Sequence, residues 1–544
     1  MSDDWQPSDH SQQSGALQQR IARGVTWTVI DTWGSQGLGL LVIAILARLL
    51  QQIDFGLVIL AAVFIGFTQL LVDQGLGDAL VQRRTLTRRQ IDTAFWAALL
   101  TGCLLTLVGV LFARPIAGLL GNALLEPILM VLSLTFILSA LTSIQMALLR
   151  RELAFRSLAI RKLAAVGGGG IVGVALAFAG FGVWALVGQQ LASAAISVLT
   201  LWTVSPWRPG RSFSRADFRE LFGFGINVVA GDALNFISRN ADNLLIGVFL
   251  GPLLTGFYGI AYRLLDTSQV LLLAFSKRVA FPTFARLQHD ADRARRAYLR
   301  MSRVSGVITL PGYIGLAVVA HEAVEVIFGP NWAASANTAA ILFLIGPVLT
   351  LQVFSGGVWN AAGHPETTFR FRLLSSVVNV IGFVIAVTVF GTIEAVALAF
   401  VVRGYLLLPL NLYWMQTKAG VPMRDHLWEL RGIAAATAVM AAAVIVAKIG
   451  LGPALQAGPL LAAEVMAGVV SYTVALWLID RAVFKEALGF VLSALPGGGR
   501  LARRLHLSLP GSEGRGGRRG QPDAAAEPSV DPLADPEKGL AGLD

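Results

Sequence analysis

The stretch Leu49–Leu57 (LLQQIDFGL) separates two runs of mostly apolar residues, each close to the length needed to cross the hydrocarbon core of a bilayer. A related stretch, Phe249–Phe257 (FLGPLLTGF), stands 200 positions later, and Ala61 corresponds to Ala261 in the same register. A correspondence at a fixed offset between apolar runs predicts a membrane protein built from two related halves.

The composition of the whole chain agrees with this interpretation. Hydrophobic residues make up 55% of the 544 positions, the mean hydropathy is +0.66, and charged residues contribute only 14%. A typical soluble chain carries about 25% charged residues, so this chain has too little polar surface for a water-soluble protein. It is also too apolar to be disordered. The single cysteine, Cys103, excludes an intrachain disulfide.

Fourteen apolar runs are expected to form membrane spans, which predicts an all-α polytopic membrane protein of about 14 transmembrane helices. Two six-helix lobes plus two C-terminal helices account for that number. The expected organisation is a polar cytoplasmic N-terminus (1–22), an N-lobe (23–205), a cytoplasmic linker (206–221), a C-lobe (222–417), an extra helix pair (418–495) and a disordered cytoplasmic tail (496–544).

The basic residues support this topology and fix an expected orientation. With both termini in the cytoplasm, 37 of the 43 Lys and Arg residues fall on the cytoplasmic side, as membrane proteins prefer. Three fall on the outer side (Arg48, Arg114 and Lys448), and three fall inside spans (Arg239, Arg263 and Arg403). Most of the net charge of +10 therefore records membrane insertion rather than an acidic ligand such as a nucleic acid.

Charged residues inside the membrane are costly and mark candidate functional sites. Guanidinium groups bind phosphate through two parallel hydrogen bonds, so the three intramembrane arginines predict a cavity for a pyrophosphate headgroup. A nearby carboxylate can take up a proton or a sodium ion. The candidates are Arg263, Arg403 and Arg239 for the substrate, and Asp232, Asp242, Asp266 and Asp31 for ion coupling.

A structural interpretation of these charges stays open. Arg263 and Asp266 are three residues apart, as are Arg239 and Asp242, so each pair can neutralise itself on one helical face. Arg403 and Asp232 have no such partner within one turn of their own helices.

Other chemistry is not indicated. The glycine run Gly167–Gly170 lacks the Lys-Ser/Thr of a phosphate-binding loop and lies within an expected span, so it predicts close helix packing, aided by Gly173. The six histidines are scattered, and the sequence indicates no metal site, no catalytic group and no cofactor.

Several segments, in this order, resemble the Wzx-type exopolysaccharide and O-antigen flippases, a polysaccharide-transporter family of the multidrug/oligosaccharidyl-lipid/polysaccharide exporter superfamily. The closest likeness is to its fourteen-span exopolysaccharide group. The segments are Gly24–Trp27 (GVTW), Asp54–Leu57 (DFGL), Asp73–Gln82 (DQGLGDALVQ), Asn240–Gly247 (NADNLLIG) with Gly251, Gly256, Tyr258, Ala261, Arg263 and Phe281–Pro282, then Phe328–Trp332 (FGPNW) and Ala361–Gly363 (AAG).

The resemblance implies a V-shaped, MATE-like pair of six-helix lobes with a central cavity and alternating access. It implies a flippase, not an enzyme, that moves undecaprenyl-pyrophosphate-linked oligosaccharides across the bacterial inner membrane. Partners would be that lipid-linked oligosaccharide, membrane lipid, and assembly proteins such as a polymerase and a chain-length regulator. Arg263 and Asp242 lie within the matched segments, whereas Arg239, Asp232 and Arg403 do not.

Two alternatives stay open. A multidrug/cation antiporter of the same superfamily needs an acidic or aromatic cavity, for which Asp31 and Asp232 are candidates. A membrane glycosyltransferase or polymerase acting on the same lipid needs acidic groups at the outer face. Among the expected outer loops, Glu322 and Glu325 form the one acidic cluster.

Overall fold

The computed structural model describes residues 4–5, 27–73, 76–83, 85–286 and 291–494. It divides into two compact units, Met1–Asp480 and Arg481–Asp544. In the second unit a single helix, α21 (Arg481–Ala494), is described. The predicted disordered tail begins two residues after this helix and lies outside the described residues, so its disorder stays a prediction.

The described chain is almost entirely helical, as expected. Its first half comprises η1 (Ile30–Gly34), α2 (Ser35–Leu49), α3 (Gln52–Asp73), α4 (Leu76–Gln82), α5 (Arg88–Leu119), α6 (Leu125–Leu132), α7 (Leu134–Arg151), α8 (Phe155–Phe178) and α9 (Val183–Val204). A reciprocal capping box between Thr87 and Gln90 starts α5. One two-residue antiparallel pair, β1 (Asp4–Trp5) with β2 (Leu86–Thr87), is the only strand pairing among the described residues.

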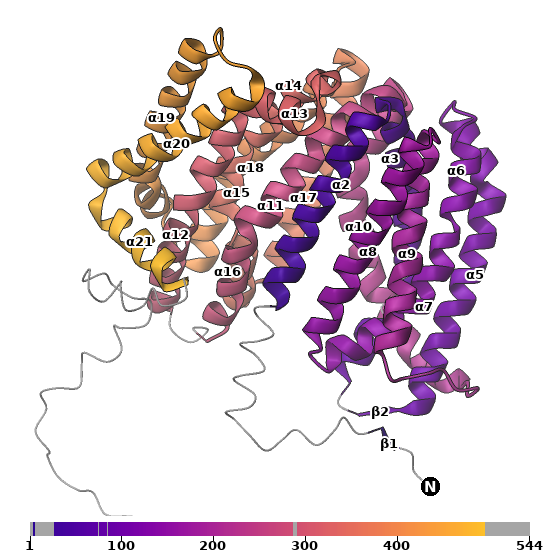
Figure 1. Cartoon of the computed structure of the whole chain (residues 1–544). Coiled ribbons are helices and arrows are strands. Elements are labelled where there is room, and N and C mark those ends of the chain that lie inside the picture. The colour runs from indigo at the N-terminus through magenta and orange to yellow at the C-terminus, as the bar shows by residue number, and fades with distance from the viewer. Residues whose placement is uncertain (1–3, 6–26, 74–75, 84, 287–290, 495–544) are drawn as a thin grey trace, which may run out of the picture. The chain divides into compact units, whose positions relative to one another are not determined.

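The second half begins with two long helices, and short connections join the elements that follow (Figure 1). They are α10 (Arg215–Leu250), α11 (Pro252–Arg286), α12 (Ala291–Val318), α13 (Ala320–Phe328), η2 (Pro330–Trp332), α14 (Ala333–Phe343), α15 (Gly346–Gln352), α16 (Ser355–Ala361), α17 (Pro365–Ile385), η3 (Ala386–Phe390), α18 (Ile393–Ala419), α19 (Met423–Leu451) and α20 (Ala457–Ile479).

Within the described residues, 12 helical segments are long and apolar enough to cross a membrane. They coincide with twelve of the fourteen expected spans. The other two expected spans fall on α10 and α11, which are not among the 12, so the number fourteen stays a prediction.

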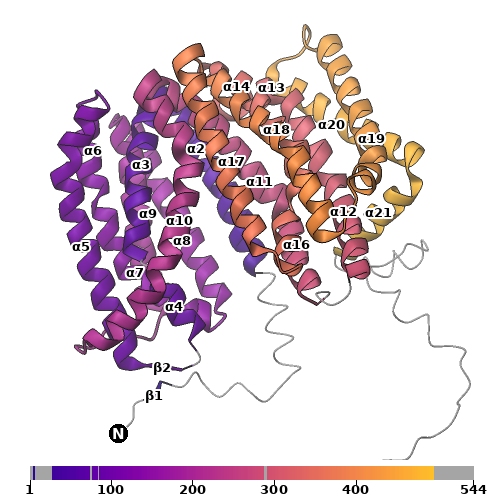
Figure 2. The same ribbon diagram turned by 180° about the vertical axis from the view of Figure 1, so that it is seen from behind.

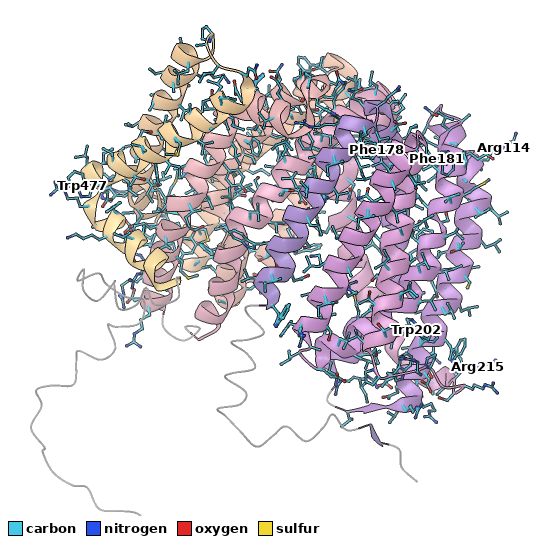
Figure 3. All side chains as sticks on the ribbon, in the orientation of Figure 1. Arg114, Phe178, Phe181, Trp202, Arg215 and Trp477 are labelled. Carbon is cyan, nitrogen blue, oxygen red and sulfur yellow. The ribbon has the colours of Figure 1, made fainter. Side chains whose placement is uncertain are left out.

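Helices of the first unit pack in two groups, and three helices, α3, α10 and α11, lie between them. α5 to α9 form one group and α12 to α20 the other, while α3 packs against both α10 and α11 (Figures 1 and 2). Arg114 of α5 and Arg215 at the start of α10 lie at opposite ends of the helices (Figure 3). Large apolar side chains such as Phe178, which is 72% exposed, cover the outside, as expected for a surface that faces lipid.

The predicted packing role of the glycine run is confirmed. A β-carbon on Gly169 would lie 1.8 Å from Ser193 Oγ of α9, and one on Gly170 would lie 2.4 Å from Val42 Cγ2 of α2. A β-carbon on Gly173 would lie 2.8 Å from Gln189 Cβ. Small residues therefore let α8 approach both α2 and α9 closely.

Candidate functional site

A cavity of about 380 Å³ lies where α2 and α9 approach α3 and α11. One wall is apolar. The lining residues are Ile43, Phe55, Val58, Ile59, Ala62, Leu186, Gln189, Gln190, Ser193, Gly259, Ile260 and Arg263. Since Arg263 is the one ionisable residue of this lining, the cavity is cationic.

The Arg263 side chain is exposed and extends from α11 toward α2. Its Nη2 atom lies 3.7 Å from the position that a β-carbon would take on Gly39, so the guanidinium reaches the surface of α2. Among the described residues no hydrogen bond or ion pair to this guanidinium is found, so the alternative that Arg263 pairs with Asp266 on its own helix does not hold there. The Asp266 side chain instead pairs with Arg239 on α10.

Polar groups of α9 complete the cavity opposite this arginine. Gln189 and Ser193 are one helical turn apart, and Ser197 follows one turn further along the same face. Beyond the cavity, Arg161 Nη1 of α8 donates to Ser197 Oγ at 3.2 Å. Sequence reasoning missed these residues because it searched for charge, although the doublet Gln189–Gln190 inside an apolar run is itself a signal.

Arg239 and Asp266 join α10 to α11. Arg239 Nη2 donates to Asp266 Oδ1 at 3.0 Å, and the two side chains are 58% and 32% exposed. The alternative that Arg239 pairs with Asp242 on its own helix is therefore not what the structure shows. Asp242 is buried and accepts hydrogen bonds from Tyr258 Oη and from the Asn243 backbone N–H, both at 2.8 Å.

Arg403 lies on α18, outside the cavity lining. It donates to Ser375 Oγ of α17 at 2.6 Å, and its guanidinium carbon lies 4.8 Å from the centre of the Phe400 ring. The Phe400 ring meets Tyr262 at 6.5 Å, and Tyr262 stacks on Tyr258 at 6.1 Å. A row of three rings thus connects Arg403 with the hydrogen-bond partner of Asp242.

The remaining ion-coupling candidates lie elsewhere. Asp31 belongs to η1, where its Oδ1 atom is 3.9 Å from Lys162 Nζ of α8. Asp232 falls within α10, but its side chain lies outside the described residues. The predicted set is thus divided between the cavity (Arg263), the α10–α11–α18 region and the η1–α8 contact. No group of three His, Cys, Asp or Glu side chains suited to a metal ion occurs in the described part of the chain.

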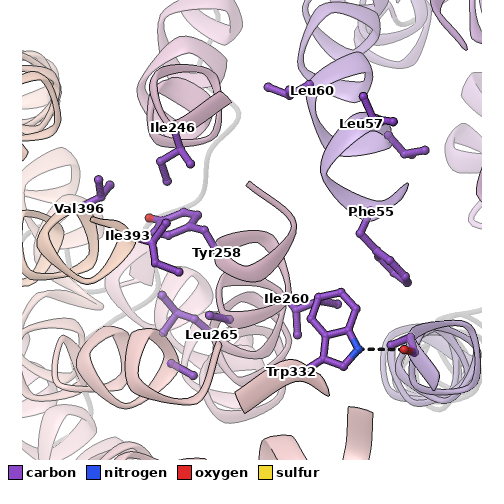
Figure 4. Packing of buried hydrophobic residues seen from close by; sticks show 14 of the residues in the cluster. Phe55, Leu57, Leu60, Ile246, Tyr258, Ile260, Leu265, Trp332, Ile393 and Val396 are labelled. Atoms are coloured by element: carbon purple, nitrogen blue, oxygen red, sulfur yellow. Dashed lines mark hydrogen bonds between the residues drawn. The ribbon is translucent and has the colours of Figure 1, made fainter. Parts of the chain in front are cut away.

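Next to the cavity, beside its lining residue Phe55, α2 and α3 contact α13 and η2 in a set of contacts here called the end contact. Trp332 Nε1 donates to the Ala47 carbonyl at 2.8 Å (Figure 4). Gln52 Nε2 donates to the Asn331 carbonyl at 3.0 Å, and Arg48 donates to the Val326 and Ile327 carbonyls near the end of α13. Trp332 is fully buried and meets Phe55 edge-on at 5.2 Å. The end contact therefore joins the two halves of the chain.

Two solved structures share this arrangement of helices. The lipid II flippase MurJ in an inward closed conformation superposes with a TM-score of 0.69 at 14% identity, covering 84% of this chain and 99% of that one. An inward-facing multidrug resistance MATE family transporter of the MOP superfamily gives 0.58 at 17% identity, covering 71% and 94%. The fold is therefore that of the MOP-superfamily transporters, as the sequence predicts.

Within that fold the chain belongs to the polysaccharide biosynthesis protein family, which it matches over residues 45–337. A relative along nearly its whole length is the succinoglycan biosynthesis transport protein ExoT of Rhizobium meliloti. The two are 28% identical over 484 residues, which cover 88% of this chain and 96% of the relative. The predicted family is confirmed.

Proposed function

We propose that this protein is a flippase that carries a lipid-linked oligosaccharide across the bacterial inner membrane during exopolysaccharide or O-antigen synthesis. The substrate is an undecaprenyl-pyrophosphate-linked repeat unit, taken from the cytoplasmic to the periplasmic leaflet. The observation that carries the proposal is Arg263, an unpartnered guanidinium among the described residues, in a cavity between the two halves of a polysaccharide-family chain.

The charge of the headgroup explains why a cationic cavity is required. A pyrophosphate bears at least two negative charges, and moving each into hydrocarbon costs several kcal/mol even after relaxation. Arg263 offsets part of that cost because its fork of N–H groups matches phosphate oxygens. The lipid tail stays in the bilayer while the head follows the polar path.

The face of α9 suits the sugar. Gln189 and Gln190 each present an amide donor pair and a carbonyl acceptor, and Ser193 adds a hydroxyl. Sugar hydroxyls both donate and accept hydrogen bonds, so neutral amides recognise them without competing for the phosphate. The proposed orientation places pyrophosphate at α11 and the first sugars at α9.

In this proposal Arg239 and Arg403 bind the pyrophosphate after Arg263 has bound it. The Arg239–Asp266 pair is more than half exposed on the arginine side, so a phosphate can replace the carboxylate at little cost. Asp266, once released, is available to a proton or a sodium ion. Asp31, Asp232 and Asp242 stay candidates for the same coupling role.

Transport by alternating access requires the end contact to open. In the proposed topology, with both termini in the cytoplasm, Arg48 lies on the periplasmic side, so the end contact closes the exit. Opening the end contact breaks the hydrogen bonds of Arg48, Gln52 and Trp332. The cavity is then accessible from the periplasmic side.

The alternatives receive less support. A cation antiporter needs a negative or aromatic cavity, whereas the ionisable lining residue here is an arginine. A glycosyltransferase or polymerase would use the acidic pair Glu322 and Glu325, but Glu322 is held by Lys448 at 2.8 Å, which leaves Glu325 as a single exposed acid. Interaction with a polymerase and a chain-length regulator stays part of the proposal.

The direct test uses the purified full-length protein in proteoliposomes that carry a fluorescent undecaprenyl-pyrophosphate-linked oligosaccharide. A membrane-impermeant quencher reports which leaflet holds the label. The expected result is label exchange between leaflets that depends on the protein. Absence of exchange together with efflux of an organic cation from the same vesicles would favour the antiporter instead.

A further inference from the structure

Glu464 of α20 is a buried carboxylate without a direct partner. Its residue has 0% exposed surface, and neither carboxylate oxygen has a hydrogen-bond partner in the described structure. An isolated buried carboxylate charge costs several kcal/mol, so a group in this position is normally neutralised. The position lies two turns into an apolar helix and outside the proposed substrate cavity.

Two charged side chains come within electrostatic range of Glu464. Lys448 arrives from α19 and Glu322 from α13, the two helices that pack most against α20. The Lys448 ammonium is already engaged, because its Nζ lies 2.8 Å from Glu322 Oε2 and donates to the Val318 carbonyl at 3.2 Å. Two carboxylates therefore share one ammonium, which leaves one negative charge without compensation.

Other titratable groups of the packed helices do not supply the missing positive charge. On α13, His321 is exposed and shares a hydrogen bond of 2.8 Å with Asn337, and Glu325 is exposed. α12 contributes the Val318 carbonyl at its end. The charged partners that α19 gives to α12, Asp425 and Glu429, lie five turns or more before Lys448.

We propose that Glu464, Glu322 and Lys448 form a proton-binding site, in which Glu464 holds an exchangeable proton that sets the net charge of the site to zero. A sodium ion fits less well. Hard cations take several oxygen ligands, and only two carboxylates are near, beside an ammonium that repels a second cation.

The site lies next to the contact between the two halves. Glu322 occupies the first turn of α13, and the carbonyls near the last turn of the same helix accept hydrogen bonds from Arg48 of α2. When Glu464 loses its proton it becomes a second carboxylate competing for Lys448. The ammonium then shifts from Glu322, and α13 loses an anchor at its first turn, while Arg48 holds the carbonyls near its last turn. Proton exchange thereby acts on the end contact.

The test combines infrared difference spectroscopy with thermal unfolding of the purified full-length protein between acidic and alkaline pH. We expect a protonated-carboxyl band that titrates in the wild type, is absent in Glu464→Gln and is retained in Glu325→Gln, a matched change at an exposed position of α13. Glutamine imitates the neutral acid, so Glu464→Gln should fold, and its Tm advantage over the wild type should grow as the pH rises.

Two results would overturn the proposal. One is the same titrating band, and the same pH dependence of Tm, in the wild type and in Glu464→Gln. The other is a band that responds to sodium against choline at fixed pH and not to pH at fixed sodium. Neither readout depends on lipid transport, so the proton site and the proposed flippase activity can fail separately.

Discussion

Gly56 of α3 and Gly256 of α11 face each other where the two halves of the chain cross. A β-carbon on Gly56 would lie 1.7 Å from the Pro252 carbonyl oxygen, and one on Gly256 would lie 2.1 Å from the Gln52 carbonyl oxygen. The positions are equivalent at an offset of 200, 52 with 252 and 56 with 256, and the contacts join them crosswise, 56 to 252 and 256 to 52. The offset seen in the sequence is thus a reciprocal contact in space.

This crossing should tolerate no side chain. Gly56→Ala and Gly256→Ala each place a methyl group against backbone that has to move, which should lower the free energy of unfolding by about 1–3 kcal/mol. Thermal unfolding in detergent measures the change. Gly37→Ala is the matched control, since a β-carbon there meets nothing within 4 Å and alanine favours the helix. Equal stability of Gly56→Ala and Gly37→Ala would contradict the close crossing.

The end contact should respond to the loss of one hydrogen bond. Trp332→Phe removes the bond to the Ala47 carbonyl and keeps an aromatic ring against Phe55. A hydrogen bond contributes about 1 kcal/mol, so opening should become about fivefold more favourable.

Labelling can measure this opening. A Ser193→Cys reporter in a Cys103→Ser background places a single thiol in the cavity. Its reaction with a membrane-impermeant maleimide from the outer side should rise in Trp332→Phe. The same change at Trp477, an exposed residue remote from the end contact, should leave labelling unaltered. Unchanged labelling in Trp332→Phe would argue against a closing role.

The Arg239–Asp266 pair should contribute little to stability. Both partners are partly exposed, and such pairs contribute below about 1 kcal/mol. A double-mutant cycle with Arg239→Ala and Asp266→Ala, read by thermal unfolding, should give a coupling free energy within that limit. A coupling of several kcal/mol would mean that the pair is a structural lock, and phosphate could not readily replace Asp266.

The sequence predicted helices and their close contacts well because both have local signatures. Apolar runs of membrane length marked the spans, and Gly167–Gly170 marked the tight packing of α8. It could not predict which helices meet around a charge. The spacing of Arg239 and Asp242 allows a pair on one helix, but Arg239 donates to Asp266 on α11, and Asp242 accepts from Tyr258.

Counting basic residues for topology also concealed specific roles. Arg303 contributes to the expected cytoplasmic excess, yet it donates to Glu429 of α19 at 3.0 Å. Arg161 contributes to the same excess and donates to Ser197 between two helices. A charge inventory records the side of the membrane and cannot record the partner, because partners come from other helices.

The account depends most directly on Arg263 as the phosphate-binding group of the cavity. The decisive measurement is the initial rate of lipid-linked oligosaccharide exchange in proteoliposomes for wild type, Arg263→Ala, Arg263→Lys and the surface control Arg114→Ala. Loss of a charge-assisted bidentate contact of about 3 kcal/mol predicts a rate at least tenfold lower in Arg263→Ala. Arg263→Lys should recover part of the rate, and Arg114→Ala should match wild type. Equal rates for Arg263→Ala and wild type, at equal amounts of folded protein, would contradict the central claim.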